Sequence, residues 1–406
     1  MAPGSGSPRC AVWSATATWA LPGDRGAPNS SARTRTLKTL HIDSERTWRG
    51  GEQQVMYLVT GLKARGHEAV VACQPGSPLA ERARAAGLEV AEVRMRGEAD
   101  FRAVLALRRL IRRGGFDIVH MHTSHAHALG CAAAALARRS RTVVSRRVDF
   151  GVATNLISGF KYHHGVNRFI AISQAVRQVL LEAGVEPGKV AVVHSGIDLA
   201  RFEAVPPGRL REEFAVAPEA PVIGNVAAMA DHKGQRYLLA AMPRVLEAEP
   251  KARLFIVGDG ELRGALEAQA AELGIRHAVT FTGFRTDVPQ WLALFDVFVM
   301  SSHLEGLCTS VLDALAMRRP VVAAAAGGLP EIIRHEATGL LVPPREPEPL
   351  ADAIVRLLRD RELGRRLAEA GRRHVEQEFS AQSMVEGTLR VYHEVMNEGP
   401  SAQSEP

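Results

Sequence analysis

The stretch ARLFIVGDGELRGALEAQAAELG at residues 252–274 decides the fold, because it holds one complete repeat of the chain's organisation. Its apolar run LFIV is typical of a strand that is buried on both faces, and Gly258 and Gly260 then mark a turn. After the turn, apolar residues return every three or four positions, which predicts an amphipathic helix. A strand, a glycine turn and a helix together form the basic unit of an α/β domain with a parallel sheet.

This unit recurs along most of the chain and forms two series. Expected strands of the first series lie at residues 38–42, 68–73, 88–95, 117–122, 142–145, 168–173 and 189–195. Expected strands of the second series lie at residues 221–228, 252–260, 278–284, 296–302 and 320–328. Helical segments separate most of them, and such alternation means parallel strands joined by right-handed crossovers. The sequence therefore predicts an α/β protein with two doubly wound, Rossmann-like domains.

Changes of composition mark the expected boundaries. Residues 1–36 are rich in Gly, Pro and Ser, and we expect a disordered extension there rather than a signal peptide. We assign residues 37–205 to the first domain and 206–378 to the second, joined near a stretch rich in Pro and charge. Residues 379–406 are expected to form one more amphipathic helix and a frayed tail. Doubly wound sheets bind ligands at the carboxyl ends of their strands, so facing edges would place the site between the domains.

The composition is that of an ordinary globular chain and argues against several other classes. The 406 residues are 46% hydrophobic and 23% charged, and no apolar run approaches the roughly 18 residues that a membrane span requires. The cysteines are Cys10, Cys73, Cys131 and Cys308. They form no CxxC pair, which argues against a disulfide framework or zinc ribbon and favours a reducing, cytoplasmic location. A net charge of +6 permits anionic partners, but no recognition motif points to nucleic acid.

The segment SSHLEGLCTSVLDALAMRRPVVA at residues 301–323 carries two carboxylates eight residues apart, Glu305 and Asp313. Thr309 or Ser310 is a suitable N-cap for the helix that follows, so its free backbone N–H groups would point back into the loop. Such a helix end attracts anions, and carboxylates on either side of a diphosphate would accept hydrogen bonds from sugar and ribose hydroxyls. The alternative is a solvated loop Glu and an Asp that favours the first helical turn.

Several stretches in register resemble the retaining glycosyltransferases of family 4. EGLCTSVLDALA is similar to the Glu-x7-Glu motif of that family, with Asp313 in the place of the second Glu. Further similar stretches are VGDGELRGALEAQAAELG, VTFTGFRTDVPQWLALFDVFVMSS, GGLPEIIRHEATGLLVPP and AISQAVRQVL with VVHSGIDLARF. The resemblance covers roughly residues 38–395. It implies the GT-B fold, in which two Rossmann-like domains face each other across a cleft, with the acceptor bound mainly by the first and the nucleotide-sugar donor by the second.

The resemblance also implies roles for individual residues of the second domain. Glu305 would hold the hydroxyls of the donor sugar and Asp313 the ribose, although Asp is one methylene shorter than Glu. Lys233 in MADHKGQ matches the family's phosphate-binding Lys, whereas the position of the family's Arg falls near Ala228, so that charge is missing. The residues whose backbone would meet the diphosphate are Gly306, Leu307, Cys308 and Thr309. Without the resemblance, Lys233 would be an ordinary exposed Lys before a helix.

In the first domain, Gly50 and Gly51 of TWRGGEQQV are expected between a strand and a helix, where glycines let the backbone approach a phosphate or sugar closely. The expected strand end DIVHMHTSHAH carries His120, His122, His125 and His127. The family pattern places one His in the cleft, and His122 matches it best, in contact with the donor sugar or the acceptor hydroxyl. For His120 we favour a buried role with a backbone hydrogen bond. A zinc cluster is the alternative, but neither carboxylate nor thiolate accompanies these histidines.

Two basic segments offer contacts to an acceptor. Arg146 and Arg147 in SRRVDF end another expected strand, where guanidinium groups would suit a phosphate or carboxylate on the acceptor or form a surface ion pair. Residues 94–113, RMRGEADFRAVLALRRLIRR, combine seven Arg with apolar residues. A basic amphipathic helix of this kind can lie on an anionic lipid surface, which would place the protein at the inner face of the cell membrane, or can pack its apolar face on the sheet.

The resemblance implies transfer of a sugar from a nucleoside diphosphate, usually UDP, to a hydroxyl with retained anomeric configuration. The acceptor would be an envelope glycan, a lipid-linked precursor or a small molecule. Lys233, the helix end and the glycine loop would stabilise the leaving diphosphate, so neither metal nor other cofactor is expected to be required. Two alternatives stay open. A UDP-sugar epimerase of the same fold would act without an acceptor, and a non-catalytic nucleotide-sugar-binding protein would explain Asp313 and the missing Arg.

Overall fold

A computed structural model describes the chain at residues 35–147 and 165–398. The strands of the first domain are β1 (Lys38–Ile42), β2 (Glu68–Cys73), β3 (Glu89–Glu92), β4 (Ile118–Met121), β5 (Arg141–Arg146), β6 (Arg168–Ala171) and β7 (Val190–Val192). Those of the second domain are β8 (Val222–Val226), β9 (Arg253–Val257), β10 (Val279–Gly283), β11 (Val297–Met300), β12 (Val321–Ala324) and β13 (Leu340–Val342). All of these strands pair in parallel, as the strand–helix alternation predicts.

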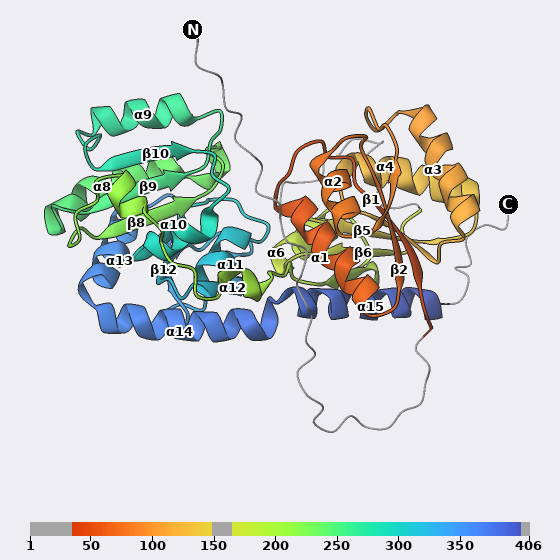
Figure 1. Ribbon diagram of the computed structural model, residues 1–406. Helices are drawn as coiled ribbons and strands as arrows, with labels where there is room; N and C mark the ends of the chain where they lie inside the picture. The colour runs from red at the N-terminus through yellow and green to blue at the C-terminus, as the bar shows by residue number, and fades with distance from the viewer. Residues whose placement is uncertain (1–34, 148–164, 399–406) are drawn as a thin grey trace, which may run out of the picture.

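The order of the strands fixes where ligands can bind. The first sheet runs β3-β2-β1-β4-β5-β6-β7 and the second runs β10-β9-β8-β11-β12-β13. In both sheets the order reverses beside the first strand, between β1 and β4 and between β8 and β11. Crossover helices on either side of that point diverge, so a crevice opens there at the carboxyl ends of the strands. The two domains stand side by side in Figure 1. The predicted pair of doubly wound domains is therefore confirmed.

Helices cover both faces of each sheet. In the first domain they are α1 (Gly50–Ala64), α2 (Pro78–Ala85), α3 (Phe101–Gly114), α4 (Ser124–Ala137) and α6 (Gln174–Glu182), with the 3-10 helices η1 (Pro187–Lys189) and η2 (Leu199–Phe202). The second domain has α7 (Leu210–Glu213), η3 (Asp231–Lys233), α8 (Gln235–Ala248), α9 (Arg263–Glu272), α10 (Val288–Leu294), α11 (Thr309–Ala316), α12 (Leu329–Ile332) and α13 (Pro347–Arg359). Two long helices follow, α14 (Arg361–Glu378) and α15 (Ala381–Asn397).

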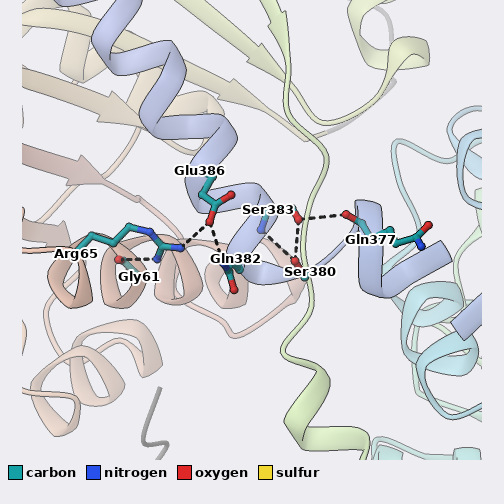
Figure 2. A network of polar contacts seen from close by, with 7 residues as sticks. All are labelled: Gly61, Arg65, Gln377, Ser380, Gln382, Ser383 and Glu386. Atoms are coloured by element: carbon teal, nitrogen blue, oxygen red, sulfur yellow. Dashed lines mark hydrogen bonds and ion pairs between the residues drawn. The ribbon is translucent and has the colours of Figure 1, made fainter. Parts of the chain in front are cut away.

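Helix α15 returns the chain to the first domain. In Figure 1, α14 lies along the second domain and α15 continues along the first. The corner between them is held by Ser380, whose hydroxyl accepts a hydrogen bond from the backbone N–H of Ser383 at 3.0 Å and caps α15. Further along, Arg65, which directly follows α1, donates to Glu386 of α15 at 3.2 Å (Figure 2). The domains are therefore joined twice, once near residues 203–220 and once at this corner.

Several expectations about element bounds need correction. The strand expected at 88–95 covers only Glu89–Glu92, and β13 lies in a stretch where no strand was expected. The helix in the basic segment starts at Phe101 because Asp100 caps it, accepting a hydrogen bond from the N–H of Ala103 at 3.1 Å. Residues 1–34 and 399–406, where an extension and a tail are expected, lie outside the described residues. The domain boundaries at 205 and 378 stay predictions.

Candidate functional site

An ion pair between two predicted site residues lies at the carboxyl edge of the second sheet. Lys233 ends η3, which follows β8, and Glu305 lies in the loop between β11 and α11. The Nζ atom of Lys233 donates to Oε2 of Glu305 at 2.6 Å, and the hydroxyl of Ser302 donates to the same oxygen at 3.2 Å. Only 9% of Glu305 is exposed. A cation and a carboxylate thus occupy adjacent positions beside the switch point between β8 and β11, where doubly wound sheets bind ligands.

Glycines hold this loop in place by letting backbone segments approach each other. The N–H of Gly328 donates to the carbonyl of Glu305 at 2.8 Å. Gly327 has a φ of 52°, and a Cβ atom there would lie 1.9 Å from the same carbonyl oxygen. The family-like stretch GGLPEII was noted for its resemblance, but its glycines were not assigned to the site. The sequence feature that could have identified them is the adjacent pair of glycines directly after an expected strand.

Replacement of Gly327 by Ala is expected to destabilise the protein by about 2 kcal/mol or more, because the side chain adds a clash to a strained φ. Chemical denaturation of the purified variant measures this. The matched control is Gly264→Ala in helix α9, where a Cβ meets no atom within 4 Å. Alanine favours a helix interior over glycine, so the control should be neutral or slightly stabilising. Equal stability of the two variants would contradict this account of the loop.

Helix α11 begins one residue earlier than expected. Its first residue is Thr309 and its N-cap is Cys308, which provides no side-chain cap, so the prediction of Thr309 or Ser310 as cap was wrong. Without a side-chain acceptor, N–H groups of the first turn stay available to an anion at this end. Leu307 and Cys308 are buried beside it. Burial, and secondarily the charge of Glu305, raises the pKa of the Cys308 thiol to about 12, so this cysteine stays protonated and unreactive.

The glycines of the first domain face this helix end. Gly50 and Gly51 are the first two residues of α1, not part of the preceding loop as expected. A Cβ at Gly50 would lie 3.5 Å from the hydroxyl oxygen of Thr309, and a Cβ at Gly306 would lie 2.7 Å from the carbonyl oxygen of Arg147. The start of α1, the end of β5 and the loop before α11 therefore meet between the domains. The structure brings together the glycines of one domain and the expected diphosphate site of the other.

Arg147 lies among carboxylates of its own domain. The pKa of Asp43 is raised to about 7, mainly by burial, and that of Glu52 is raised for the same reason. In both cases the charge of Arg147 opposes the shift, which places the guanidinium near these two groups. Glu52 also caps α1 by accepting from the N–H of Arg49 at 2.6 Å. Arg146, the last residue of β5, is half-buried. A role for either arginine in acceptor binding stays a prediction.

His122 follows β4 directly and belongs to a cluster of three buried histidines. His120 and His122 are joined by His41 of β1, and one nitrogen of each lies within 4.8 Å of the others. His120 contacts the hydroxyls of Tyr392 at 2.7 Å and Ser145 at 2.8 Å, so the expectation of a backbone partner was wrong. Both nitrogens of His41 also have partners. A metal ion could therefore bind the three histidines only by displacing hydrogen bonds, although these residue types suit one.

The hydrogen bonds that link Thr39, His41 and His122 fix which nitrogen of each imidazole carries the proton. The hydroxyl of Thr39 donates to the carbonyl of Glu68 at 3.1 Å, so it must accept from Nε2 of His41 at 3.0 Å. Burial lowers the pKa of His41 to about 3, so His41 is neutral and its Nδ1 accepts from Nε2 of His122 at 3.0 Å. Burial also lowers the pKa of His122, which leaves its Nδ1 as a bare acceptor. That atom has no hydrogen-bond partner among the described residues.

Replacement of Thr39 by Val is expected to remove the preference for one tautomer of His122. Without the hydroxyl, the Nε2–H of His41 loses its acceptor, so each of the two possible proton orders leaves one N–H group unpaired. His122 should then populate both tautomers, with its proton at Nε2 or at Nδ1. NMR spectra of the imidazole nitrogens distinguish the two tautomers. Thr39→Ser keeps the hydroxyl and should retain the original state, and identical spectra for both variants would contradict the proton order.

Asp313 lies in α11 near a tyrosine and an arginine. The carboxyl is half-buried, and burial raises its pKa to about 7, opposed by the charge of Arg201. Arg201 belongs to η2 and donates to the hydroxyl of Tyr57 in α1 at 2.9 Å. The structure therefore places Asp313 beside groups of the first domain as well as in the helix whose start is the expected anion site. A contact of Asp313 with ribose stays a prediction.

A contact between the domains was missed by sequence reasoning. Glu331 of α12 accepts from the N–H groups of Gln174 and Ala175 at 2.8 and 3.1 Å, and so caps α6 of the other domain. Nε2 of His194 lies 3.0 Å from Glu331 as well. Sequence spacing cannot reveal such a cap, because donor and acceptor are 157 residues apart. The contact holds the two domains together next to the glycines that follow β12.

Comparisons with known proteins agree with this arrangement. Residues 48–201 match the model of Glycosyltransferase Family 4, and residues 220–360 match that of Glycosyl transferases group 1. An uncharacterized glycosyltransferase of Methanocaldococcus jannaschii is 27% identical over 82% of this chain and 92% of its own length. A GDP-mannose-dependent alpha-(1-6)-phosphatidylinositol monomannoside mannosyltransferase of Mycobacterium tuberculosis is 36% identical over 44% of this chain, a match that spans 49% of that enzyme.

The solved structures include HepE of Anabaena in complex with UDP and glucose. It superposes with a TM-score of 0.79 at 22% identity, over 88% of this chain and 99% of HepE. Likeness at this level of identity concerns the fold, and it agrees with the two facing domains described above. The two family models together match most of both domains. The chain therefore belongs to glycosyltransferase family 4 and is a glycosyltransferase with the GT-B fold.

Proposed function

We propose that this glycosyltransferase moves a sugar from a nucleoside-diphosphate donor, most readily a UDP-sugar, to a hydroxyl group with retention of the anomeric configuration. The observation that carries the proposal is the contact between Lys233 and Glu305 at the open start of α11. A diphosphate needs a cation and N–H donors, and the sugar attached to it needs an acceptor for its hydroxyls. The donor would insert between the two side chains, with its phosphates at Lys233 and its sugar at Glu305.

The remaining residues would complete the donor site. The backbone of residues 306–309 and the start of α1 at Gly50 and Gly51 would face the diphosphate from opposite domains. The bare Nδ1 of His122 would accept a hydrogen bond from a sugar or acceptor hydroxyl. Asp313 would reach the ribose. In a retaining front-face attack, an oxygen of the leaving phosphate takes the proton of the attacking hydroxyl, so the protein has to supply charge stabilisation and positioning.

We propose further that the reaction requires no metal ion, because Lys233 and the start of α11 supply positive charge and N–H dipoles at the diphosphate. Transfer or donor hydrolysis should then persist after dialysis against EDTA. Loss of all turnover with chelator, restored by a divalent cation, would overturn this part.

Contact with a membrane surface is a second part of the proposal. Helix α3 packs Ala103, Val104, Leu107 and Ile111 inward, whereas Phe101 is 66% exposed at its start beside exposed arginines. An exposed aromatic with cations suits an anionic lipid surface such as the inner face of a cell membrane. No described helix is both long and apolar enough to cross a bilayer. Sedimentation with phosphatidylglycerol vesicles, but not with phosphatidylcholine vesicles, would support contact through α3, and its persistence in Phe101→Ser would oppose it.

The proposed donor is tested by thermal unfolding with a panel of UDP-, GDP- and ADP-sugars. A ligand that binds only the folded state raises the melting temperature. Stabilisation by one donor, weakened in both Glu305→Ala and Lys233→Ala, is the expected result. An unchanged melting temperature with every donor, in the presence and absence of candidate acceptors, would overturn the proposal. Conversion of a donor into a new nucleotide sugar without an acceptor would favour an epimerase instead.

A further inference from the structure

An arginine-lined hollow lies at the carboxyl edge of the first sheet. It has a volume of about 410 Å³ and is lined by Arg46, Gln74, Pro75, Gly76, Ser77, Arg94 and Arg96. These residues come from the loops that follow β1, β2 and β3, three neighbouring strands of the sheet. Ligands of doubly wound domains bind at this edge. The hollow is therefore on the acceptor side of the molecule, in loops to which no role has been assigned so far.

A buried glutamine fixes the three loops relative to one another. The amide nitrogen of Gln74 donates to the carbonyl of Ser44 at 3.1 Å and to that of Met95 at 2.5 Å. Its amide oxygen accepts from the N–H of Met95 at 3.1 Å. Only 4% of Gln74 is exposed. Because Ser44 and Met95 lie within two residues of the three arginines, this amide holds the backbone that carries all three guanidinium groups.

The three guanidinium groups have few neighbouring acids. Asp100 lies near Arg96, but backbone N–H groups, first that of Ala103, are the main cause of its lowered pKa, and the charge of Arg96 adds only a small part. Arg46, Arg94 and Arg96 are exposed, and in the described parts of the chain none of them forms an ion pair. The nearby carboxylate of Glu92 pairs with Arg84 at 2.9 Å and accepts from the N–H of Gly76 at 3.2 Å. Three like charges around one hollow repel one another, and an anion between them removes that cost.

We infer that this hollow binds an anionic group of the acceptor, a phosphate or a carboxylate. Guanidinium groups bind such oxyanions through paired hydrogen bonds, and three of them, one after β1 and two after β3, can surround one phosphate. The inference rests on the proposed function, since it names the chemistry of the acceptor in the same reaction. It differs from the earlier expectation for Arg146 and Arg147, because Arg147 lies near the buried carboxyls of Asp43 and Glu52, whereas these three arginines line an exposed hollow and form no ion pair among the described residues.

The frame of the hollow continues into the active site. Ser44, whose carbonyl accepts from Gln74, also contacts the hydroxyl of Thr123 at 2.6 Å through its own hydroxyl. Thr123 directly follows His122 and caps α4. An acceptor anchored at the arginines would therefore lie next to the chain segment that carries His122. Its hydroxyl could reach the donor sugar while its anionic group stays in the hollow.

The inference is tested by calorimetric titration of the full chain with glycerol 3-phosphate, and with glycerol as the uncharged probe. The titrations use Lys233→Ala protein, so that the donor phosphate site does not contribute, and also native protein saturated with a nucleoside diphosphate. Glycerol 3-phosphate should bind and glycerol should not. Arg46→Gln, Arg94→Gln and Arg96→Gln should each raise the Kd by about tenfold or more. Arg373→Gln removes an exposed charge of α14, far from the hollow and from α3, and should change the Kd by less than about twofold.

Vesicle binding distinguishes a lipid headgroup from a free phosphorylated compound as the source of the anionic group. Binding to phosphatidylcholine vesicles that contain phosphatidylinositol, lost in the Arg94→Gln variant, would assign the hollow to a lipid headgroup. Binding of glycerol 3-phosphate alone would assign it to a free phosphorylated acceptor. The inference is overturned if neither probe binds, or if Arg373→Gln weakens binding as much as the three variants in the hollow. A failed donor panel with retained phosphate binding would overturn the proposed function and leave this site standing.

Discussion

The Glu305→Gln variant is expected to lose about a hundredfold or more of its turnover, because it removes a preorganised charge at the reacting sugar. The substitution keeps the size of the side chain and one acceptor oxygen. It leaves the diphosphate site intact and frees Lys233 from its ion pair. Binding of the nucleoside diphosphate alone should therefore be unchanged or tighter, while the intact donor binds more weakly. Sugar transfer assays and calorimetry of donor and nucleotide measure the two effects separately.

Loss of fold is a competing explanation that stability data can exclude. The side chains of Lys233 and Glu305 are 18% and 10% exposed, so removal of one partner leaves a poorly solvated charge and should cost about 2 kcal/mol. The double variant Glu305→Gln, Lys233→Met should recover part of that stability and none of the turnover. Full turnover in Glu305→Gln, or recovery of turnover in the double variant, would contradict the role of Glu305 at the sugar.

The sequence predicted the architecture because the strands are buried on both faces. Runs such as VFVM in β11 leave little choice of fold when amphipathic helices alternate with them. Contacts between elements far apart in the sequence escaped prediction, because no local pattern encodes them. The cap of α6 by Glu331 and the contact of His120 with Tyr392 join residues whose separations in sequence carry no periodic signal. The two carboxylates were singled out by their spacing and Lys233 by the resemblance to family 4, and the structure places Lys233 and Glu305 in contact.

Helix and strand ends were predicted less well than the elements themselves. The start of α11 was placed at the best capping side chain, but the helix begins beyond Cys308 without one. A cap is worth only about 1 kcal/mol, so packing of the buried face can move a helix start by a residue. Strand β13 was missed for a different reason, because an apolar run of three residues is too short to show a periodic pattern. Such local differences matter here, because the proposed diphosphate site lies at this uncapped helix start.

The Lys233→Met variant is expected to lower kcat/KM for the donor by about a hundredfold to a thousandfold, since the leaving diphosphate loses its cation. Methionine keeps the unbranched stem and removes only the charge. Binding of the nucleoside diphosphate should weaken as much as binding of the donor, because Lys233 would contact the part that both share. This distinguishes it from Glu305→Gln, in which only the donor is affected.

Lys233→Arg is the matched control for this prediction. It keeps the positive charge, so it should bind the nucleoside diphosphate better than Lys233→Met even where the larger group fits the site poorly. Product inhibition by the nucleoside diphosphate, measured in transfer assays for native protein, Lys233→Arg and Lys233→Met, should rank the three proteins in the same order of nucleotide affinity. If Lys233→Met retained normal nucleotide binding and lost only donor binding, the cation would act at the sugar, and the assignment of phosphates to Lys233 and hydroxyls to Glu305 would have to be reversed.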